Sequence, residues 1–127
     1  MRKKIVTIAG VLLVLAVLCA VEQSVVNTIT REALFQIQEI LEMVRRGELR
    51  AGLEKAHALD VFWDGQASGL EILVDHSDAE KVNSGISRLI AALEGDDQAM
   101  AMIYVHEVKK NIEHVRERQA LTIQNVL

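Results

Sequence analysis

A charge-free apolar run near the first residue constrains this chain more than any other feature. It extends from Ile5 to Val21 as IVTIAGVLLVLAVLCAV, seventeen residues between the basic tip Arg2-Lys3-Lys4 and Glu22. A helix rises about 1.5 Å per residue, so the run covers roughly 25 Å of the roughly 30 Å hydrocarbon core of a bilayer, and flanking side chains can reach outward to cover the difference. A core helix of a soluble protein normally has a polar face, which this run lacks. We therefore expect residues 1–21 to form a basic tip and a transmembrane anchor.

The basic tip also predicts an orientation. The positive-inside rule keeps the tip in the cytoplasm and places residues 22–127 outside it, as the extracytoplasmic domain of a single-pass protein of the cell membrane. A cleaved signal peptide is the alternative, because a basic start and an apolar run describe both. Ala20 would suit such a cut, but Leu18 stands where a small residue is needed. Leu18 also stands where a lipoprotein box needs a small residue before its cysteine, here Cys19, so we expect an uncleaved anchor.

The composition of residues 22–127 indicates which partners and which fold class the domain can have. They hold eleven basic and eighteen acidic side chains, a net charge of −7, which argues against nucleic acid as a partner. The single cysteine lies in the apolar run, so no disulfide holds the domain together. The chain has no proline, half of its residues are hydrophobic, and only four are aromatic. We expect an all-α domain packed through aliphatic side chains.

Apolar residues recur at intervals of three or four, which predicts four helices at about 22–46, 48–75, 78–94 and 97–120. The first could continue directly from the anchor, because no helix breaker separates them. Its predicted inner face is Val26, Ile29, Ala33, Ile37, Ile40 and Val44. The second is expected to bury Leu49, Leu53, Ala56, Trp63, Ala67, Leu70 and Val74, with Leu59 and Phe62 at the flanks. The third is expected to bury Val82, Ile86, Leu89, Ile90 and Leu93, and the fourth Met100, Ile103, Tyr104, Val108, Ile112 and Val115.

Turn signals separate these helices. Gly47 suits a C-cap, Ser77-Asp78-Ala79-Glu80 fits a capping box with Ser77 as the N-cap, and Gly95 precedes a cap at Asp96 or Asp97. Connections of one to three residues force successive helices to be antiparallel. The predicted architecture is a transmembrane helix followed by an antiparallel up-down bundle of about four helices. Two glycines in the second helix, Gly65 and Gly69, make a bend there plausible.

Two neighbouring carboxylate–imidazole pairs are the candidates for chemistry: Asp75-His76 and Glu113-His114. Such groups can bind a metal or exchange protons. Adjacent helical residues point about 100° apart, so neither pair makes a site by itself. We therefore predict no metal site and no cofactor, and keep His76 and His114 as the candidates for a metal. The structural interpretation is that Asp75 and His76 close a helix and organise the turn into Ser77.

Three further polar or aromatic residues receive structural interpretations. Trp63 is the only tryptophan and is expected to be a core anchor with its indole N–H bonded nearby, rather than a ligand platform. Asp60 lies on or beside the same face and is expected to form an ion pair with a lysine or arginine, rather than to be part of a polar pocket. The apolar end LTIQNVL, residues 121–127, is expected to dock, with the Asn125 amide fixing it to a neighbouring helix.

The order of these features resembles a known family. Trp63, the run Leu73-Val74-Asp75-His76, the segment Glu113-His114-Val115 and the closing Asn125-Val126-Leu127 follow a basic tip and a short apolar segment. This is similar to small, N-terminally membrane-anchored helical proteins of spore-forming Gram-positive bacteria, which form a domain of unknown function. The resemblance covers essentially the whole chain and implies one anchor, a helical domain outside the membrane and no assigned activity. Gly65 and Gly69 depart from that pattern.

These features favour a non-enzymatic interaction or structural module of the bacterial cell envelope, whose partner is another envelope protein or a second copy. No glycine-rich phosphate loop, nucleophile elbow, CxxC or HExxH motif is present in the sequence. The alternative is an extracytoplasmic ligand- or metal-sensing bundle, which would have to signal through a partner because no second span follows. A secreted helical enzyme or inhibitor would require cleavage of the anchor.

Overall fold

The computed structural model describes residues 1–126, with the side chains of 67, 68, 71–73 and 120–126 left out of the description. It contains four α-helices: α1 (Arg2–Arg45), α2 (Leu49–Leu73), α3 (His76–Glu94) and α4 (Gln98–Val126). Residues 1–126 contain no strand, so the all-α prediction is confirmed. The predicted helices differ from the observed ones at their ends: α3 begins at His76, two residues before the predicted start, and α4 continues to Val126.

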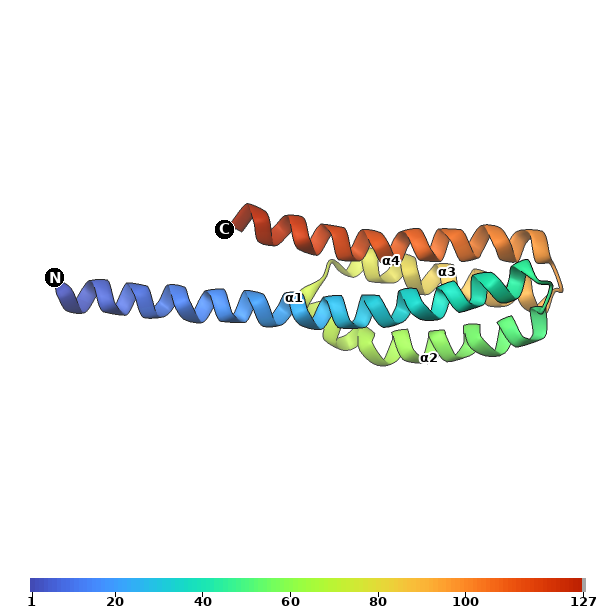
Figure 1. Ribbon diagram of the computed structural model, residues 1–127, viewed down its shortest axis with the longest axis horizontal. Coiled ribbons are helices and arrows are strands. Elements are labelled where there is room, and N and C mark those ends of the chain that lie inside the picture. Colours follow the sequence, from blue (N-terminus) through green and yellow to red (C-terminus); the bar gives the residue numbers. More distant parts are fainter. Residues whose placement is uncertain (127) are drawn as a thin grey trace.

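The first helix joins the apolar run to the bundle without a break. It comprises 44 residues, about 66 Å, and the blue half of it projects alone from the bundle (Figure 1). The large apolar side chains from Ile5 to Val21 are all more than half exposed, whereas burial begins at Val26. Within residues 1–126, α1 is the one helix long and apolar enough to cross a membrane.

A spacing of alternately three and four residues relates the buried positions on each helix. This average of 3.5 residues is the pattern of helices that pack at about 20° in a left-handed bundle. The buried positions that follow this spacing are Val26, Thr30, Ala33, Ile37, Ile40 and Val44 on α1; Ala56, Leu59, Trp63 and Leu70 on α2; Ala79, Val82, Ile86, Leu89 and Leu93 on α3; and Ala101, Val105, Val108, Ile112 and Val115 on α4. Leu41 and Asp78 are also buried, each next to a member of this series. The core therefore runs the length of the bundle as one aliphatic seam around Trp63.

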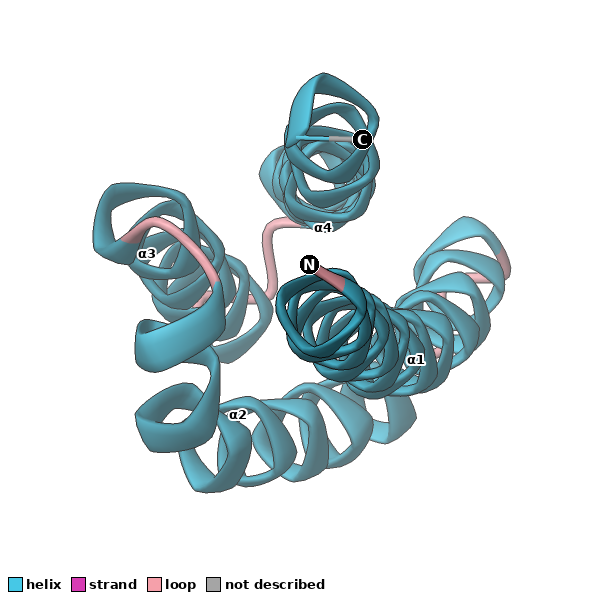
Figure 2. Cartoon of the chain, turned by 90° about the vertical axis from the view of Figure 1, so that its left-hand side faces the viewer, coloured by secondary structure: helices cyan, strands magenta, loops and turns pink. Residues whose placement is uncertain are grey.

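Each helix packs against its two neighbours in a closed square. The contacting pairs are α1 with α2, α2 with α3, α3 with α4, and α4 with α1. Figure 2, which looks along α1 from its N-terminal end, shows α1 between α4 and α2, with α3 on the opposite corner. The predicted up-down order of four antiparallel helices is therefore correct.

Two of the three turns have the same backbone geometry. After α1, the Glu48 amide donates to the Met43 carbonyl and the Gly47 amide to the Val44 carbonyl, with Gly47 at φ +77°. This is a Schellman motif with glycine in its left-handed position, as the sequence predicts. After α3 the same pair of bonds forms, but Asp96 occupies the left-handed position at φ +56°, and Gly95 lies one residue before it.

Two predictions about the helices need correction or completion. On α4, Met100 and Ile103 are exposed, and the buried face instead begins with Ala101 and Val105. The predicted face was rotated because apolar residues occupy both sides of the first turns of α4, while Ala101 follows the 3.5-residue spacing of Val108, Ile112 and Val115. On α2, the helix continues through Gly65 and Gly69, so the prediction of one long helix is confirmed.

Candidate functional site

Trp63 occupies the structural position that the sequence predicts. Its side chain is fully buried, and its indole Nε1 donates a hydrogen bond to the Ala79 carbonyl oxygen at 3.3 Å. That carbonyl lies in the first turns of α3, so the bond joins the middle of α2 to the start of the next helix. A fully buried indole with its donor satisfied is a core anchor and offers no ring face to a ligand.

Asp75, and not Ser77, is the N-cap of α3. The Asp75 Oδ1 accepts a hydrogen bond from the Ser77 amide at 2.9 Å, and the Asp75 carbonyl accepts from the amides of Asp78 and Ala79. The predicted capping box therefore starts two residues too late, because Asp and Ser are both good N-caps and the sequence permits either start. Asp75 does organise the turn as expected, whereas His76 begins α3 and does not close α2.

The earlier start of α3 creates a polar clasp that the sequence did not reveal. Asp78 lies in the first turn of α3 with only 2% of its surface exposed, and Arg118 Nη1 donates to its Oδ1 at 3.1 Å and its Oδ2 at 3.0 Å. Arg118 also lies 3.9 Å from Asp75. The carboxylates favour the positive end of the α3 dipole, and Arg118 neutralises them from α4. This clasp fixes the start of α3 against α4 and is structural.

The candidate metal residues lie in two adjoining grooves that share Lys81 and Asn111. His76 lines one with Ser77, Glu80 and other residues of α3 and α4, whereas His114 lines another with Lys110, Glu113 and Glu117. Among residues whose side chains are described, no three His, Cys, Asp or Glu groups come together as a potential metal site. His57 is near Glu94, at 3.9 Å, in the opposite half of the bundle.

Asp60 does not form the predicted ion pair among the described side chains. It is half-buried on α2, and burial raises the pKa of its carboxyl group. The nearby Asp64 carboxylate raises this pKa further, and His57 lowers it in part.

Two predictions concern side chains outside the described part of the chain: the role of the Asn125 amide and the docking of residues 121–127.

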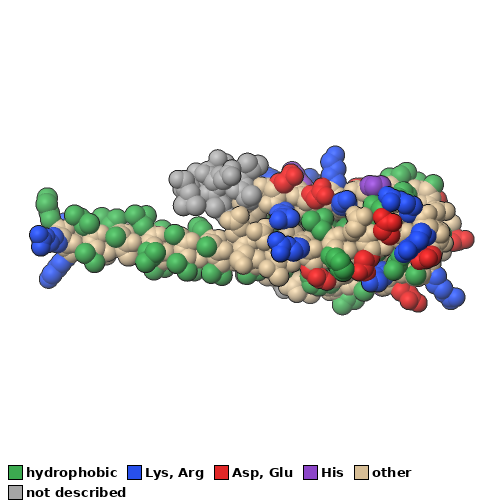
Figure 3. Space-filling view, in the orientation of Figure 1, with side chains coloured by type: hydrophobic (Ala, Val, Ile, Leu, Met, Phe, Trp, Pro, Cys, Tyr) green, Lys and Arg blue, Asp and Glu red, His purple; other side chains and the backbone are tan. Residues whose placement is uncertain are grey.

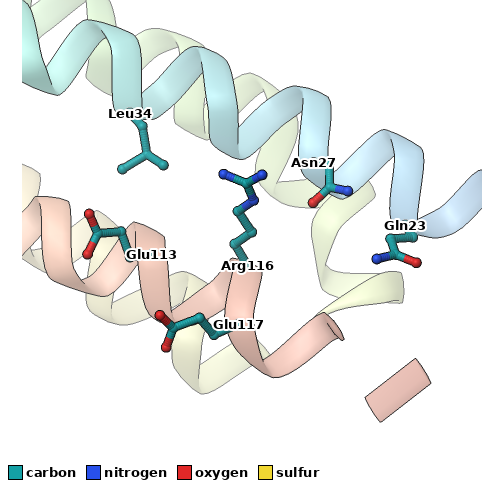
Figure 4. A pocket seen from close by; sticks show the side chains of 6 residues that line it. All are labelled: Gln23, Asn27, Leu34, Glu113, Arg116 and Glu117. Atoms are coloured by element: carbon teal, nitrogen blue, oxygen red, sulfur yellow. The ribbon is translucent and has the colours of Figure 1, made fainter. Parts of the chain in front are cut away.

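A polar groove lies where α1 enters the bundle, and sequence reasoning missed it. A groove of about 450 Å³ between α1 and α4 is lined by Gln23, Asn27, Leu34, Glu113, Arg116 and Glu117. Figure 4 shows the Arg116 side chain extending from α4 toward α1, with its guanidinium between Leu34 and Asn27. Among the described side chains, Arg116 forms no ion pair. The cation therefore points into an open polar groove.

A second groove on α1 continues this surface. It is lined by Ala20, Gln23, Ser24, Asn27, Thr28 and Arg31, so it shares Gln23 and Asn27 with the first groove. We call the residues of the two grooves together the polar collar. Between Glu22 and Arg31 the sequence holds no charged residue, and that uncharged polar stretch after the apolar run was the available signal. Figure 3 shows the result as an uncharged tan zone between the green apolar rod and the charged bundle.

Fold and surface together define an acidic four-helix bundle whose first helix continues into an exposed apolar rod. The family described as Domain of unknown function (DUF4363) matches residues 20–126, and the chain belongs to that family. Its match therefore covers the bundle and begins at the last turn of the apolar run. Searches of curated proteins and of solved structures found no match.

Proposed function

We propose that this protein is a non-enzymatic interaction module of the bacterial cell envelope, anchored in the membrane by α1. In this proposal residues 5–21 span the bilayer as a single pass, the tip stays in the cytoplasm, and the bundle stands on the extracytoplasmic side. The bundle then presents a surface to another envelope protein or to a second copy of the chain. The single observation that carries the proposal is the exposed apolar half of α1.

The exposure of that apolar half supports membrane anchoring. From Ile5 to Val21 every large apolar side chain points outward on all sides of a single helix, between 52 and 70% exposed. Soluble proteins rarely expose contiguous apolar patches above a few hundred Å². A lipid bilayer covers such a helix around its whole circumference, whereas a protein groove would cover one face. The absence of charge between Lys4 and Glu22 fits the hydrocarbon core.

The charge distribution supports the orientation. The three basic residues of the tip precede the span, and residues 22–127 carry a net charge of −7. Lysine and arginine resist translocation far more than aspartate and glutamate, so the tip is retained and the acidic bundle crosses.

Exposed apolar side chains on α1 and α2 support interaction with a protein partner. Phe35 is 61% exposed on α1, in a groove with Glu32, Glu39 and Glu54, and Val61 is 73% exposed on α2. Lys55 pairs with Glu39 across this groove. A large aromatic side chain among carboxylates suits a partner that offers an apolar pocket with basic residues around it.

Membrane fractionation tests the anchor. The full-length chain should stay in the membrane pellet after alkaline carbonate washing, while a variant with Leu12, Leu13 and Leu15 changed to aspartate should be released. Protease added outside intact spheroplasts should digest the bundle. A full-length chain that washes off the membrane, or a bundle digested only after lysis, would refute the anchor or its orientation respectively.

Site-specific photocrosslinking tests the partner. A benzophenone side chain at Phe35 should give a discrete adduct in cells, identified by mass spectrometry as one envelope protein or as the dimer. The same group at Ile103, 56% exposed on α4, is the matched control and should give no adduct of that mass. Equal adducts from both positions would indicate random collision and contradict the proposed surface.

A further inference from the structure

We propose that the end of α4, residues 119–126, lies in the headgroup layer of the bilayer beside α1, so that the bundle touches the membrane at a second place. The partner of this surface is the lipid itself, at the boundary between headgroups and hydrocarbon. The inference rests on the proposed anchoring of α1 and extends it, because a bundle held at two places has a defined tilt on the membrane.

A hydrogen bond between α1 and α4 gives the level, along the axis of α1, that the end of α4 reaches. Lys109 Nζ donates to Gln38 Oε1 at 3.2 Å. The two helices are antiparallel and rise equally per residue, so each residue further along α4 is level with one residue earlier on α1. Val126 follows Lys109 by seventeen residues, and Val21 precedes Gln38 by seventeen. The end of α4 is therefore level with the end of the apolar run.

A second hydrogen bond gives a somewhat deeper level. Gln98 Nε2 donates to the Val44 carbonyl oxygen at 2.8 Å, and the same count from this bond makes Val126 level with Ala16, about 8 Å below Val21. A tilt of α1 by about 20°, with helix axes about 10 Å apart, changes these levels by only about 3 Å. Figure 1 shows α4 extending past the α2–α3 turn toward the apolar rod, in agreement with both counts.

Charge disappears from α4 where the headgroup layer begins. Arg118 is the last charged residue of the chain, and residues 119–127 carry no charge. With Val21 at the edge of the hydrocarbon core, the two counts place Gln119 about 3–11 Å above that edge. The polar layer of one leaflet is roughly 5–8 Å thick, the difference between the full bilayer and its core divided over two sides. The uncharged end of α4 therefore covers the depth of the headgroups, and the charged part stands above it.

The surface of α1 is also open and uncharged at this depth. The side chain of Val21 is 54% exposed and that of Val25 is 42% exposed, and burial begins only at Val26. No charged residue lies between Glu22 and Arg31. Two helices from opposite ends of the chain thus lose their charge at the same level. A bilayer surface covers both at once, because it is a plane that crosses the two helices at one depth.

The composition of the end of α4 suits the boundary of the bilayer and not its hydrocarbon core. Residues 121–127, LTIQNVL, combine four aliphatic residues with three uncharged polar ones. The last four carbonyl groups of a helix have no partner within it, and water can bind them among the headgroups but not in the hydrocarbon. We therefore expect this end to lie in the interface, as amphipathic segments do, and not to cross the membrane.

Fluorescence quenching tests the inference in the full-length protein reconstituted into phosphatidylcholine vesicles. A nitrobenzoxadiazole fluorophore is attached to Ile123→Cys or Gln124→Cys in a Cys19→Ala background, since Cys19 is the only cysteine. Adjacent helical residues point about 100° apart, so at least one label faces away from α1. We expect loss of its fluorescence when the phosphatidylcholine carries a nitroxide on its headgroup, and little loss with aqueous iodide.

The matched control is Ile103→Cys in the same background. Ile103 is 56% exposed on the same helix, twenty residues before Ile123 and so about 30 Å further from the membrane. A label there should lose its fluorescence with iodide and keep it with the nitroxide lipid. Labels at 123 and 124 that behave like the one at 103 would place the end of α4 in water and overturn the inference. Protection of both from iodide and from the nitroxide lipid would mean that protein covers this end, and would overturn the lipid assignment.

The remaining outcomes separate this proposal from the anchor. Native Cys19 is partly exposed on the rod, and a label on it should be quenched by a nitroxide near the top of the acyl chain. If Cys19 is quenched in this way while the labels on α4 are not quenched by lipid, the second contact is refuted and the anchor stands. Protein that fails to float with the vesicles refutes both. The fluorescence of Trp63 shows in each variant whether the bundle is folded, because this buried indole is the only one in the chain.

Discussion

Replacing Gly85 by alanine should reveal how closely α3 and α4 approach. A Cβ added at Gly85 would lie 2.9 Å from Cγ2 of Val108 and 3.9 Å from its Cα. A β-branched side chain in a helix has one strongly preferred rotamer, so Val108 has no easy way to withdraw. Overpacking of this kind costs about 1–3 kcal/mol, while glycine to alanine in a helix interior gains about 1 kcal/mol. We expect Gly85→Ala to destabilise the bundle by about 1 kcal/mol.

The double variant with Val108→Ala makes the reasoning quantitative. Val108→Ala alone should cost about 2–3 kcal/mol, through two lost methyl groups and the cavity they leave. With Cγ2 removed, Gly85→Ala should keep only its helix-propensity gain and stabilise by about 1 kcal/mol. The effect of one substitution thus changes sign, and the coupling between the two positions is about 2 kcal/mol.

Urea unfolding of the full-length protein in mild detergent, followed by Trp63 fluorescence, measures these differences. Gly65→Ala is the matched control: it lies within α2, an added Cβ meets nothing within 4 Å, and the variant should be about 1 kcal/mol more stable than wild type. If Gly85→Ala stabilised the bundle as much as Gly65→Ala does, the close approach of α3 and α4 would be refuted. A coupling within error of zero would refute the role of Val108.

Three further predictions concern single carboxylates. Asp96→Gly should stabilise the bundle by about 1 kcal/mol, because Asp96 has φ +56° and glycine adopts that conformation at no steric cost; thermal unfolding checks this. Asp97→Ala should destabilise it by about 1 kcal/mol, since Asp97 Oδ1 accepts the amide hydrogen bond at the start of α4. The pKa of Asp60 is raised by burial and by Asp64, so the folded protein holds this proton more tightly than the unfolded chain. Stability should therefore fall as pH rises from the ordinary aspartate pKa through the raised pKa, and Asp60→Asn should remove that part of the pH dependence in urea titrations between about pH 3 and 7.

The sequence was sufficient for the number, order and direction of the helices because the determinants are local. Apolar spacing, Gly47 and short connections fix them before any long-range contact forms. The buried position of Trp63 also follows from its place on an apolar face. The inner face of α4 did not follow, because Met100 and Ile103 compete with Ala101 and Val105, and only packing against α1 and α3 decides between them.

The polar sites depended on contacts that sequence spacing does not encode. Asp78 and Arg118 are forty positions apart, and their pairing requires knowing that α3 starts at His76 and that α4 lies beside it. The groove of Arg116 likewise needs Asn27 from the other end of the chain. The Asp60 ion pair was predicted because a half-buried carboxylate normally has a cation beside it, yet its charged neighbours on α2 include Asp64 and His57.

Because α1 is unbroken, it fixes the rotation of the bundle relative to the apolar rod as well as the distance between them. Since Arg2–Arg45 is one helix, the side of the apolar rod that faces a given direction is locked to one face of the bundle. One alanine inserted after Glu22 would turn the rod by about 100° relative to the bundle, while seven inserted residues would return it to within about 20° and lift the bundle by about 10 Å. A partner that contacts both the rod and the bundle would therefore tolerate the longer insertion better than the shorter one. The rotation of the rod about the helix axis, more than the length of the helix, therefore decides which face of the bundle such a partner meets.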